Sequence, residues 1–361
     1  MELSDQSKKN LQQIVELSHR FGTTDYVCGG GGNASVKNET ILWIKPSGTM
    51  LSSISAGTFL AMDRKILSKI SEIEPPADPA ARETLVKDKM AEAVLPQTPG
   101  RASVEAPLHN TINARFVVHT HPAIVNGMTC SRQGSDVCRK LFPNALWLDY
   151  INPGYTLCMK VRQRILQYKA EYKREPAIIF LKNHGVFVAA DDPQSLRNIY
   201  DHIFKTLCKY YSEKDIKTTL TIDPCPVGNK LQALKNKIIS AMGNENLCIE
   251  ASGAFDIADG PISPDHIVYS KSFALVEEPT HKSVETFKAE HGYLPQVIAC
   301  ENAVFGIAET HKKASLALKL ARDGALVKQL TQAFGGIEYM TNRASEFIEN
   351  WEVESYRAKQ I

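Results

Sequence analysis

The spacing of apolar residues along the chain predicts helices that alternate with short strands. The N-terminal stretch repeats apolar side chains at helical spacing and predicts an amphipathic helix. The residues that carry this pattern are Leu11, Ile14, Val15 and His19. A glycine run at 29–32 leads into a predicted strand at 35–37, and the apolar stretch at 41–45 predicts a second strand. We therefore expect a tight backbone loop between the first helix and the first strand.

Residues 57–95 read as helical. Met62, Ile66 and Ile70 recur at a spacing of four, and a charged helix is expected to run through Met90 and Val94 after a proline-rich turn. The chain from 103 to 122 then predicts a loop, a helix and a strand.

Ser103 is the expected N-cap of that helix. This start places Glu105 in the first turn and Pro107 at a position that tolerates proline. Glu105 and His109 would then share one face of the helix.

Two apolar runs within 176–192 are separated by Lys182–Gly185, which predicts a hairpin or a sharp bend with His184 at its centre. A long helix is expected from Gln194 to about Tyr211. Residues 218–230 are rich in proline and turn formers, and they predict a boundary between a domain at 1–222 and a region at 223–361.

The second region is expected to form a small α/β unit. Helices are predicted at 230–242, 282–292, 311–334 and 347–358, and extended segments at 247–252, 266–278, 296–300 and 303–308. The last two extended segments are expected to pair.

Composition narrows the class of protein. A length of 361 residues favours two domains, and a net charge of +2 gives no reason to expect a nucleic acid or a membrane surface as partner. The N-terminus lacks the layout of a signal peptide, and no apolar run is long enough to span a bilayer. The eight cysteines are scattered without a C-x-x-C pair. We therefore expect a cytoplasmic protein with buried thiols.

His119 and His121 are the first candidates for chemistry. In a strand, alternate side chains point the same way, so both imidazoles would emerge from one face. Such a pair can bind a metal, but it can also be hydrogen-bonded packing. His184 in the distant turn and Glu105 would complete a set of neutral imidazoles and one oxygen ligand, which suits zinc.

The glycine run and the turn Pro46–Gly48 are candidates for binding a phosphate. They offer open backbone N–H groups beside the polar side chains of Asn33, Ser35 and Ser47. The alternative is two tight turns next to a sheet, with Lys45 as a solvated strand residue. The run also matches the letters of a dinucleotide fingerprint, but strand and turn follow it where that motif requires a helix.

These residues resemble the class II aldolase/adducin family. The resemblance rests on Gly32–Ser35 as G-N-x-S, on Ser47–Gly48, on Glu105, on the His119 and His121 pair, and on Asn183–Gly185, in that order. The second region, through Gly260–Lys271 and Phe347–Lys359, resembles the later part of the aldolase module in bifunctional rhamnulose-phosphate aldolase/alcohol dehydrogenases.

The resemblance implies a fold and a set of roles. The fold is an α/β/α sandwich around a mostly antiparallel sheet, usually assembled as a tetramer with active sites at subunit interfaces. Phosphate binding falls on Gly32, Asn33, Ser35, Ser47 and Gly48, metal binding on His119, His121 and His184, and acid/base catalysis on Glu105. The implied cofactor is Zn²⁺, with another divalent metal as an alternative.

The implied reaction is the reversible cleavage of a ketose 1-phosphate, with L-rhamnulose 1-phosphate the first candidate, to dihydroxyacetone phosphate and an aldehyde. Cleavage beside a carbonyl leaves an enediolate, whose charge a zinc ion can stabilise. The same site also suits an epimerase or a dehydratase of sugar phosphates, and adducin-like relatives bind without catalysis. The family's late tyrosine could be Tyr155, Tyr293 or Tyr339, and His109 is either a residue that supports the site or a core histidine.

Overall fold

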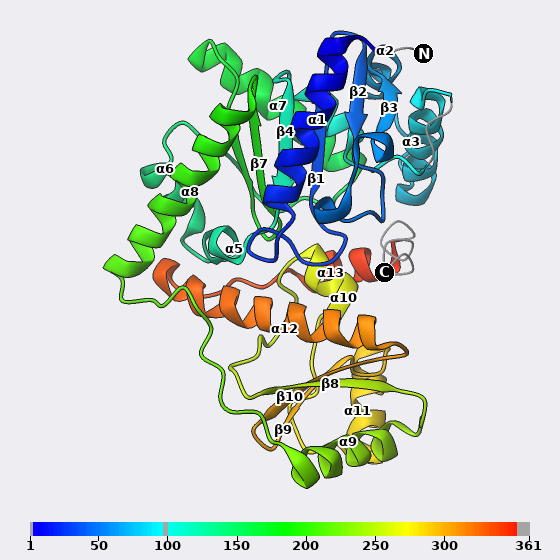
Figure 1. Ribbon diagram of the computed structural model, residues 1–361, viewed down its shortest axis with the longest axis vertical. Helices are drawn as coiled ribbons and strands as arrows, with labels where there is room; N and C mark the ends of the chain where they lie inside the picture. Colours follow the sequence, from blue (N-terminus) through cyan, green and yellow to red (C-terminus); the bar gives the residue numbers. More distant parts are fainter. Residues whose placement is uncertain (1–2, 97–99, 352–361) are drawn as a thin grey trace. The chain divides into compact units, whose positions relative to one another are not determined.

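The chain forms two compact units in the computed structural model, which describes residues 3–96 and 100–351. Among the described residues, unit 1 runs through Val125 and resumes at Ser135–Leu207, and unit 2 consists of Asn126–Gly134 and 208–351 (Figure 1). The boundary expected near residue 222 falls in the irregular segment between two helices, whereas the units divide earlier along the chain. The domain limits from the sequence stay a prediction.

Unit 1 is built on a seven-stranded sheet with the order β3-β2-β1-β4-β7-β6-β5. Its strands are β1 (Asn33–Lys37), β2 (Ile41–Ile44), β3 (Leu60–Asp63), β4 (Phe116–Thr120), β5 (Leu146–Leu148), β6 (Ile178–Leu181) and β7 (Gly185–Ala190). Neighbouring strands are antiparallel except for β5 and β6, which are parallel. The expectation of a mostly antiparallel sheet is therefore confirmed.

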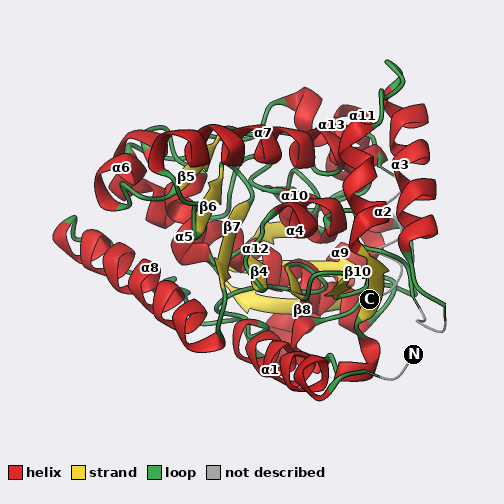
Figure 2. Ribbon diagram, turned by 90° about the horizontal axis from the view of Figure 1, so that it is seen from above, coloured by secondary structure: helices red, strands yellow, loops and turns green. Residues whose placement is uncertain are grey.

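Helices cover both faces of this sheet (Figure 2). They are α1 (Asp5–Phe21), α2 (Arg64–Lys69), α3 (Pro79–Ala93), α4 (Ala106–Thr111), α6 (Gly134–Leu141), α7 (Tyr155–Tyr172) and α8 (Pro193–Glu213), and α5 (Ala123–Thr129) follows β4. Helices α1 and α8 lie on one face, and α4 and α7 lie on the other. This α/β/α layering is the one that the resemblance implied.

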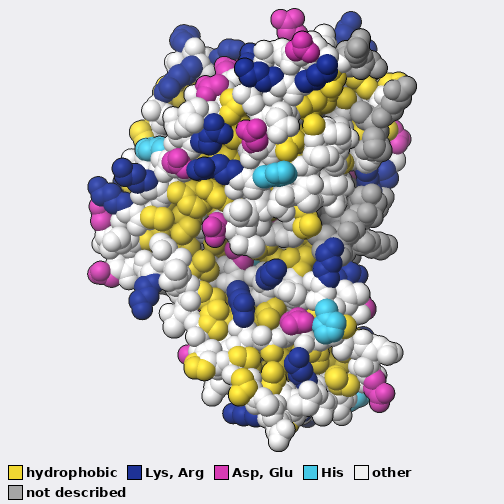
Figure 3. All heavy atoms as spheres, viewed as in Figure 1, with side chains coloured by type: hydrophobic (Ala, Val, Ile, Leu, Met, Phe, Trp, Pro, Cys, Tyr) yellow, Lys and Arg dark blue, Asp and Glu magenta, His cyan; other side chains and the backbone are white. Residues whose placement is uncertain are grey.

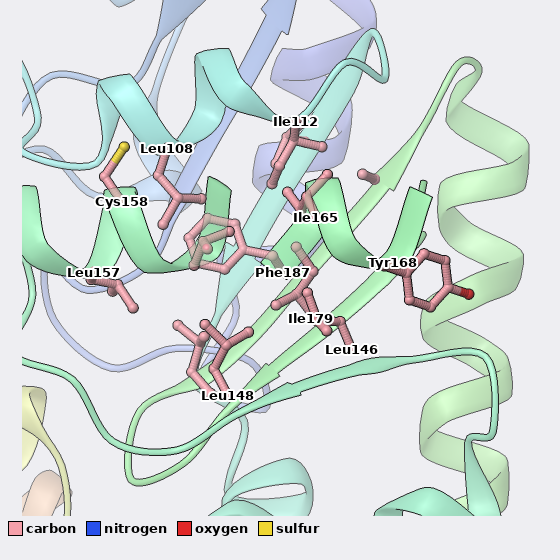
Figure 4. Packing of buried hydrophobic residues seen from close by; sticks show 14 residues of the cluster. Leu108, Ile112, Leu146, Leu148, Leu157, Cys158, Ile165, Tyr168, Ile179 and Phe187 are labelled. Carbon is pink, nitrogen blue, oxygen red and sulfur yellow. The ribbon is translucent and has the colours of Figure 1, made fainter. Parts of the chain in front are cut away.

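The alternation of side chains along the central strands fills two cores. Leu108 of α4 and Leu157 and Ile165 of α7 pack against Phe187 and Ile179 of the sheet (Figure 4). On the other face, Tyr200 of α8 stacks on Phe21 of α1 with ring centroids 4.1 Å apart. The face that carries α4 is also the one on which the candidate site lies.

Two predictions for unit 1 were wrong. Met62 lies in β3, where it pairs with Leu42, and not in a helix. Pairing with β2 and burial decided this segment against its helical spacing. Ser103 is not the N-cap of α4, because Glu105 takes that position and Ser103 Oγ accepts a hydrogen bond from the Glu105 backbone N–H at 3.3 Å.

Unit 2 contains a three-stranded antiparallel sheet in the order β8-β10-β9. Its elements are α9 (Gly228–Met242), β8 (Cys248–Gly253), α10 (Pro264–Ser270), α11 (His281–His291), β9 (Val297–Cys300), β10 (Ala303–Ala308), α12 (His311–Thr331) and α13 (Asn342–Asn350). Helices α9 and α11 pack on one face of the sheet and α12 on the other. The expected α/β unit and its paired last strands are confirmed.

The segment 266–278 is the main error in unit 2. It was expected to be extended, but its first part forms α10, which begins at Pro264 after Ser263. Apolar periodicity does not separate a short buried helix from a strand, and here the proline at the first helical position favoured the helix. Within α10, His266 joins Ser263 Oγ at 2.7 Å to Asp323 Oδ2 of α12 at 3.1 Å.

The last predicted helix was placed too late. Helix α13 begins at Asn342, and the part of the expected helix beyond Trp351 lies outside the described residues.

Within 3–96 and 100–351, no helix is both long and apolar enough to cross a bilayer. Charged side chains of both signs are intermixed on the face seen in Figure 3.

Candidate metal centre

The antiparallel pair of β1 and β4 sets the frame of the site. The register places Asn33 opposite His119, and His121 follows directly after the end of β4 at Thr120. The two imidazoles converge as the strand alternation predicted, with their Nε2 atoms 2.9 Å apart. His119 is completely buried.

The third histidine comes from the turn between β6 and β7. Asn183 has a positive φ of 51°, which a tight two-strand connection requires, and His184 follows it. Its Nε2 lies 3.3 Å from His119 Nε2. The ligand atoms of His119, His121 and His184 all lie within 4.8 Å of one another.

Hydrogen bonding fixes the tautomer of His119. Its Nδ1 lies 3.0 Å from the carbonyl oxygen of Val186, and a carbonyl can only accept, so Nδ1 carries the proton. In the neutral imidazole, Nε2 therefore presents a lone pair to the other two histidines. Phe187 stacks on the ring, with centroids 3.9 Å apart and an interplanar angle of 7°, and holds its orientation.

Glu105 adds a carboxylate to the three imidazoles. Its Oε1 lies 3.3 Å from His119 Nε2, and its side chain is 14% exposed. The side chain makes no capping hydrogen bond to α4. Instead, Glu105 Oε2 accepts a hydrogen bond of 3.2 Å from Asn33 Nδ2.

This donor set fits a divalent cation. Nitrogen lone pairs that converge to 2.9 and 3.3 Å in a buried place repel one another unless a proton or a cation lies between them. Three nitrogens bound tetrahedrally to one zinc ion at ~2.05 Å lie ~3.3 Å apart, close to the separations seen here. His119, His121 and His184 could thus hold the metal, with Glu105 beside it.

The two candidate phosphate turns lie together. Lys45 Nζ donates to Thr49 O at 2.7 Å and to Gly30 O at 3.4 Å, so one ammonium joins the glycine run to the turn that contains Ser47 and Gly48. Lys45 is only 3% exposed, and its interpretation as a solvated strand residue was wrong. This arrangement places a positive charge beneath both turns.

The glycine run also lies next to the histidine cluster. Gly32 has a φ of 68°, and a Cβ at this position would lie 2.9 Å from the carbonyl oxygen of His119. Gly32 and Asn33 therefore lie next to the imidazole cluster, whereas Ser47 and Gly48 are partly exposed. The phosphate roles of these residues stay a prediction.

Ser35 is placed differently from the other phosphate candidates. It is completely buried, and its Oγ lies 2.7 Å from Nδ1 of His109. Burial lowers the pKa of His109 from 6.5 to about 3, so this histidine is neutral at ordinary pH. The expected alternatives for His109 thus meet, because it is a core histidine that also contacts a residue of the G-N-x-S motif.

Sequence reasoning missed two contacts of the site. Ser103 accepts a hydrogen bond of 2.7 Å from Asn33 Nδ2, although its position in the sequence suggested only a helix cap. The backbone carbonyl of Val186 orients His119, and no side-chain pattern signals such a contact.

The three candidate tyrosine hydroxyls have partners in their own units. These partners are Ile73 O for Tyr155, the Phe273 N–H for Tyr293 and the Asp259 N–H for Tyr339.

Comparison with solved structures gives matches with TM-scores below 0.5 to proteins described as aldolases. The N-terminal class II aldolase domain of a conserved protein from Thermoplasma acidophilum is 25% identical, covers 58% of this chain and 95% of its own, and has a TM-score of 0.48. A structure described as L-fuculose 1-phosphate aldolase is 14% identical, covers 64% of this chain and 95% of its own, and has a TM-score of 0.40.

Among curated proteins, a Bacillus subtilis (strain 168) protein named "Uncharacterized oxidoreductase YuxG" is 22% identical over 99% of this chain. The chain spans 59% of the length of that relative. An L-fuculose phosphate aldolase from Methanococcus maripaludis is 38% identical, but only over 12% of this chain and 23% of its own length.

The sequence profile of the family described as "Class II Aldolase and Adducin N-terminal domain" matches residues 12–211. The match covers more than half of the chain and includes His119, His121 and His184. The chain belongs to the class II aldolase and adducin family.

Proposed function

We propose that the protein is a metal-dependent lyase that reversibly cleaves a ketose 1-phosphate to dihydroxyacetone phosphate and an aldehyde. The observation that carries this proposal is the convergence of three imidazole Nε2 atoms with the Glu105 carboxylate. A histidine cluster with a purely structural role has no need of a carboxylate 3.3 Å away. The Glu105 side chain makes no capping hydrogen bond to its own helix and lies against the histidines instead. Zn²⁺ is the cofactor we propose, with another divalent metal as the alternative.

A divalent cation held by His119, His121 and His184 would act as a Lewis acid toward negative charge that develops beside the substrate carbonyl. Glu105 lies at the edge of this cluster and is partly exposed, so its carboxylate can take up and return a proton at the carbon or oxygen next to the cleaved bond. Asn33 holds Oε2 and leaves Oε1 on the side of the cluster.

The glycine run at 29–32 and the turn at Ser47 and Gly48 support the choice of a phosphorylated sugar as substrate. Lys45 places a buried positive charge beneath the glycine run and the turn at Ser47 and Gly48. Gly32 brings this loop against the backbone of His119. A small phosphorylated sugar could therefore be anchored at one end while its carbonyl meets the metal centre.

The test uses the purified chain with Zn²⁺ and a panel of ketose 1-phosphates, beginning with L-rhamnulose 1-phosphate. Dihydroxyacetone phosphate is measured by its enzymatic reduction with NADH. We expect release from at least one substrate, and a loss of at least about 100-fold in kcat for Glu105→Gln. His281→Ala, an exposed histidine of unit 2, is the matched control for histidine replacement and should leave the rate unchanged.

The mass of the products separates the alternatives that use the same site. Aldol cleavage gives two smaller molecules, dehydration removes one water, and epimerisation leaves the mass unchanged. A protein that contains stoichiometric metal and releases no dihydroxyacetone phosphate from any ketose 1-phosphate would not be this lyase. A protein that binds no metal would favour an adducin-like binding role. The homo-tetramer that the resemblance implies is a further proposal, which light scattering measures directly.

A further inference from the structure

We infer that Ser35, Lys37 and His109 form a polar ladder between β1 and α4 that positions Glu105 at the metal centre. The inference rests on the proposed role of Glu105 as the acid/base group. It makes Ser35, Lys37 and His109 positioning residues, since each acts through α4 and not on the substrate.

The ladder is a consequence of side-chain alternation along one strand. Asn33, Ser35 and Lys37 are alternate residues of β1 and share one face. Asn33 Nδ2 donates to Glu105 Oε2 at 3.2 Å, and Ser35 Oγ lies 2.7 Å from His109 Nδ1. One strand therefore contacts the N-cap residue of α4 and a residue one turn later.

The third residue of this set, Lys37, contacts the end of α4. Lys37 Nζ donates to the backbone carbonyls of His109 and Ile112, which belong to the last turn and the C-cap of α4. These hydrogen bonds provide donors at the end of the helix, where carbonyls lack partners within the helix. The helix is thus held at its start, middle and end from the same strand.

The burial of these groups argues that their polarity has a purpose. Ser35 and His109 are completely buried and Lys37 is 2% exposed. His109 Nε2 has no hydrogen-bond partner among the described residues. Burying a lysine, a serine and a histidine costs free energy that an apolar interface would not. Apolar packing would hold α4 against the sheet but would allow the helix to rotate about its axis and to shift along the strand. Both movements would change where Glu105 lies.

The length of α4 makes this control necessary. A helix of six residues spans only about 9 Å and makes few contacts of its own. Its far side is also fixed by hydrogen bonds, because Asn110 accepts from Arg64 Nε at 2.8 Å and donates to Ser68 Oγ at 3.1 Å. Catalytic groups need placement to within about 0.5 Å, which a loosely packed helix of this size does not provide.

The inference changes the role of Ser35. The motif alone assigned this serine to phosphate binding, but its hydroxyl is buried against His109. Asn33 faces the metal centre from the same strand, two residues earlier. The motif then serves two purposes, with its asparagine at the carboxylate and its serine at the helix that carries that carboxylate.

The test is a double-mutant cycle between Ser35→Ala and Glu105→Gln, with zinc affinity measured by chelator competition. Ser35→Ala alone should weaken zinc binding by about 10-fold, within the range for residues that orient a metal site. In the Glu105→Gln background the same change should have almost no effect, because the group that it positions has been altered. Ser35→Thr keeps the hydroxyl and should restore most of the affinity.

Ser18→Ala is the matched control, because Ser18 is a buried serine of α1 whose Oγ donates to Ile14 O at 2.7 Å. It should lower the melting temperature about as much as Ser35→Ala does and leave zinc affinity unchanged. If Ser35→Ala equals Ser18→Ala in zinc affinity, or if its effect persists undiminished with Glu105→Gln, the ladder is only structural and the inference is wrong.

Lys37→Met gives a second variant if Ser35→Ala does not fold, and the same cycle applies to it. The readout also separates this inference from the proposed function. Absence of zinc binding by the unaltered protein contradicts the metal-dependent lyase. Normal zinc binding with no coupling between Ser35 and Glu105 contradicts only the ladder.

Discussion

Asn33 lies directly opposite His119 in the antiparallel pair of β1 and β4, and its side-chain amide donates a hydrogen bond of 3.2 Å to Glu105 Oε2. The same amide nitrogen donates to Ser103 Oγ at 2.7 Å. One asparagine therefore connects the strand of the first metal-binding candidate to the helix of the candidate acid/base group. Because the amide nitrogen is a donor, it pairs with the acceptor oxygen of the Glu105 side chain and fixes its position.

We expect Asn33→Asp to be the most damaging change at this position. A second carboxylate would replace the donor and repel Glu105, so kcat/KM should fall by at least about 100-fold, whereas Asn33→Ala should cost about 10-fold. Steady-state kinetics on the substrate identified by the ketose 1-phosphate panel measures both. Asn236→Asp on the exposed side of α9, in unit 2, adds the same charge and should have no effect. Equal rates for the two aspartate variants would contradict this role of Asn33.

Metal content is expected to depend on each of the three histidines. Replacement of His121 or His184 by Ala should lower zinc affinity by more than about 100-fold, because loss of a direct ligand exceeds the 10- to 100-fold effect of residues that only orient one. Elemental analysis after dialysis measures the retained metal. A His184→Ala variant that keeps one zinc per chain would exclude this histidine as a ligand.

Gly185 should be intolerant of any side chain. A Cβ there would lie 2.4 Å from the carbonyl oxygen of Thr120 and 2.6 Å from Cδ2 of His121. Gly185→Ala must therefore displace the start of β7 or the ring of His121, and we expect a loss of zinc affinity of at least about 10-fold. Gly57→Ala is the control, since a Cβ there meets no atom within 4 Å. Undiminished zinc binding by Gly185→Ala would show that His121 can move aside freely.

The buried His109 should make the fold sensitive to acid. Its pKa is lowered from 6.5 to about 3 by burial, so the unfolded chain binds a proton that the folded chain does not between these values. The contribution of neutral His109 to the free energy of unfolding is fully present above pH 6.5 and is lost as the pH falls toward 3. At about pH 5 the loss for one such group is about 2 kcal/mol of the free energy of unfolding.

His109→Gln removes this titration. The decrease in the free energy of unfolding between about pH 7.5 and pH 5, measured by urea denaturation, should be smaller in the variant by about 2 kcal/mol. Comparing each protein with itself cancels the general cost of the substitution. The same pH dependence in both proteins would show that His109 does not stay neutral in the fold.

Unit 2 should depend on His266 for stability and not for metal binding. This histidine bridges Ser263 Oγ and Asp323 Oδ2, and His266→Ala leaves the buried serine and the partly exposed aspartate without that hydrogen bond. We expect a loss of about 2–4 kcal/mol of unfolding free energy, visible in urea denaturation, with zinc affinity unchanged. A loss of zinc with no change in stability would contradict this division.

The clustering of the three histidines could be predicted from local sequence. His119 and His121 point the same way because strand side chains alternate, and His184 was correctly placed at the centre of a bend. These features depend on spacing within a few residues, which a sequence displays directly. The mostly antiparallel sheet came from the resemblance and not from the pattern of residues.

Other features depended on packing between segments far apart in the chain. Met62 joined β3 because β2 was available to pair with it, and 264–270 became a helix that packs against α12 of unit 2. The sequence by itself determined which side chains could bind a metal. Only the tertiary structure decided that Ser35 faces His109, that Lys45 is buried and that Asn33 holds Glu105, because each is a contact between residues at least 15 positions apart.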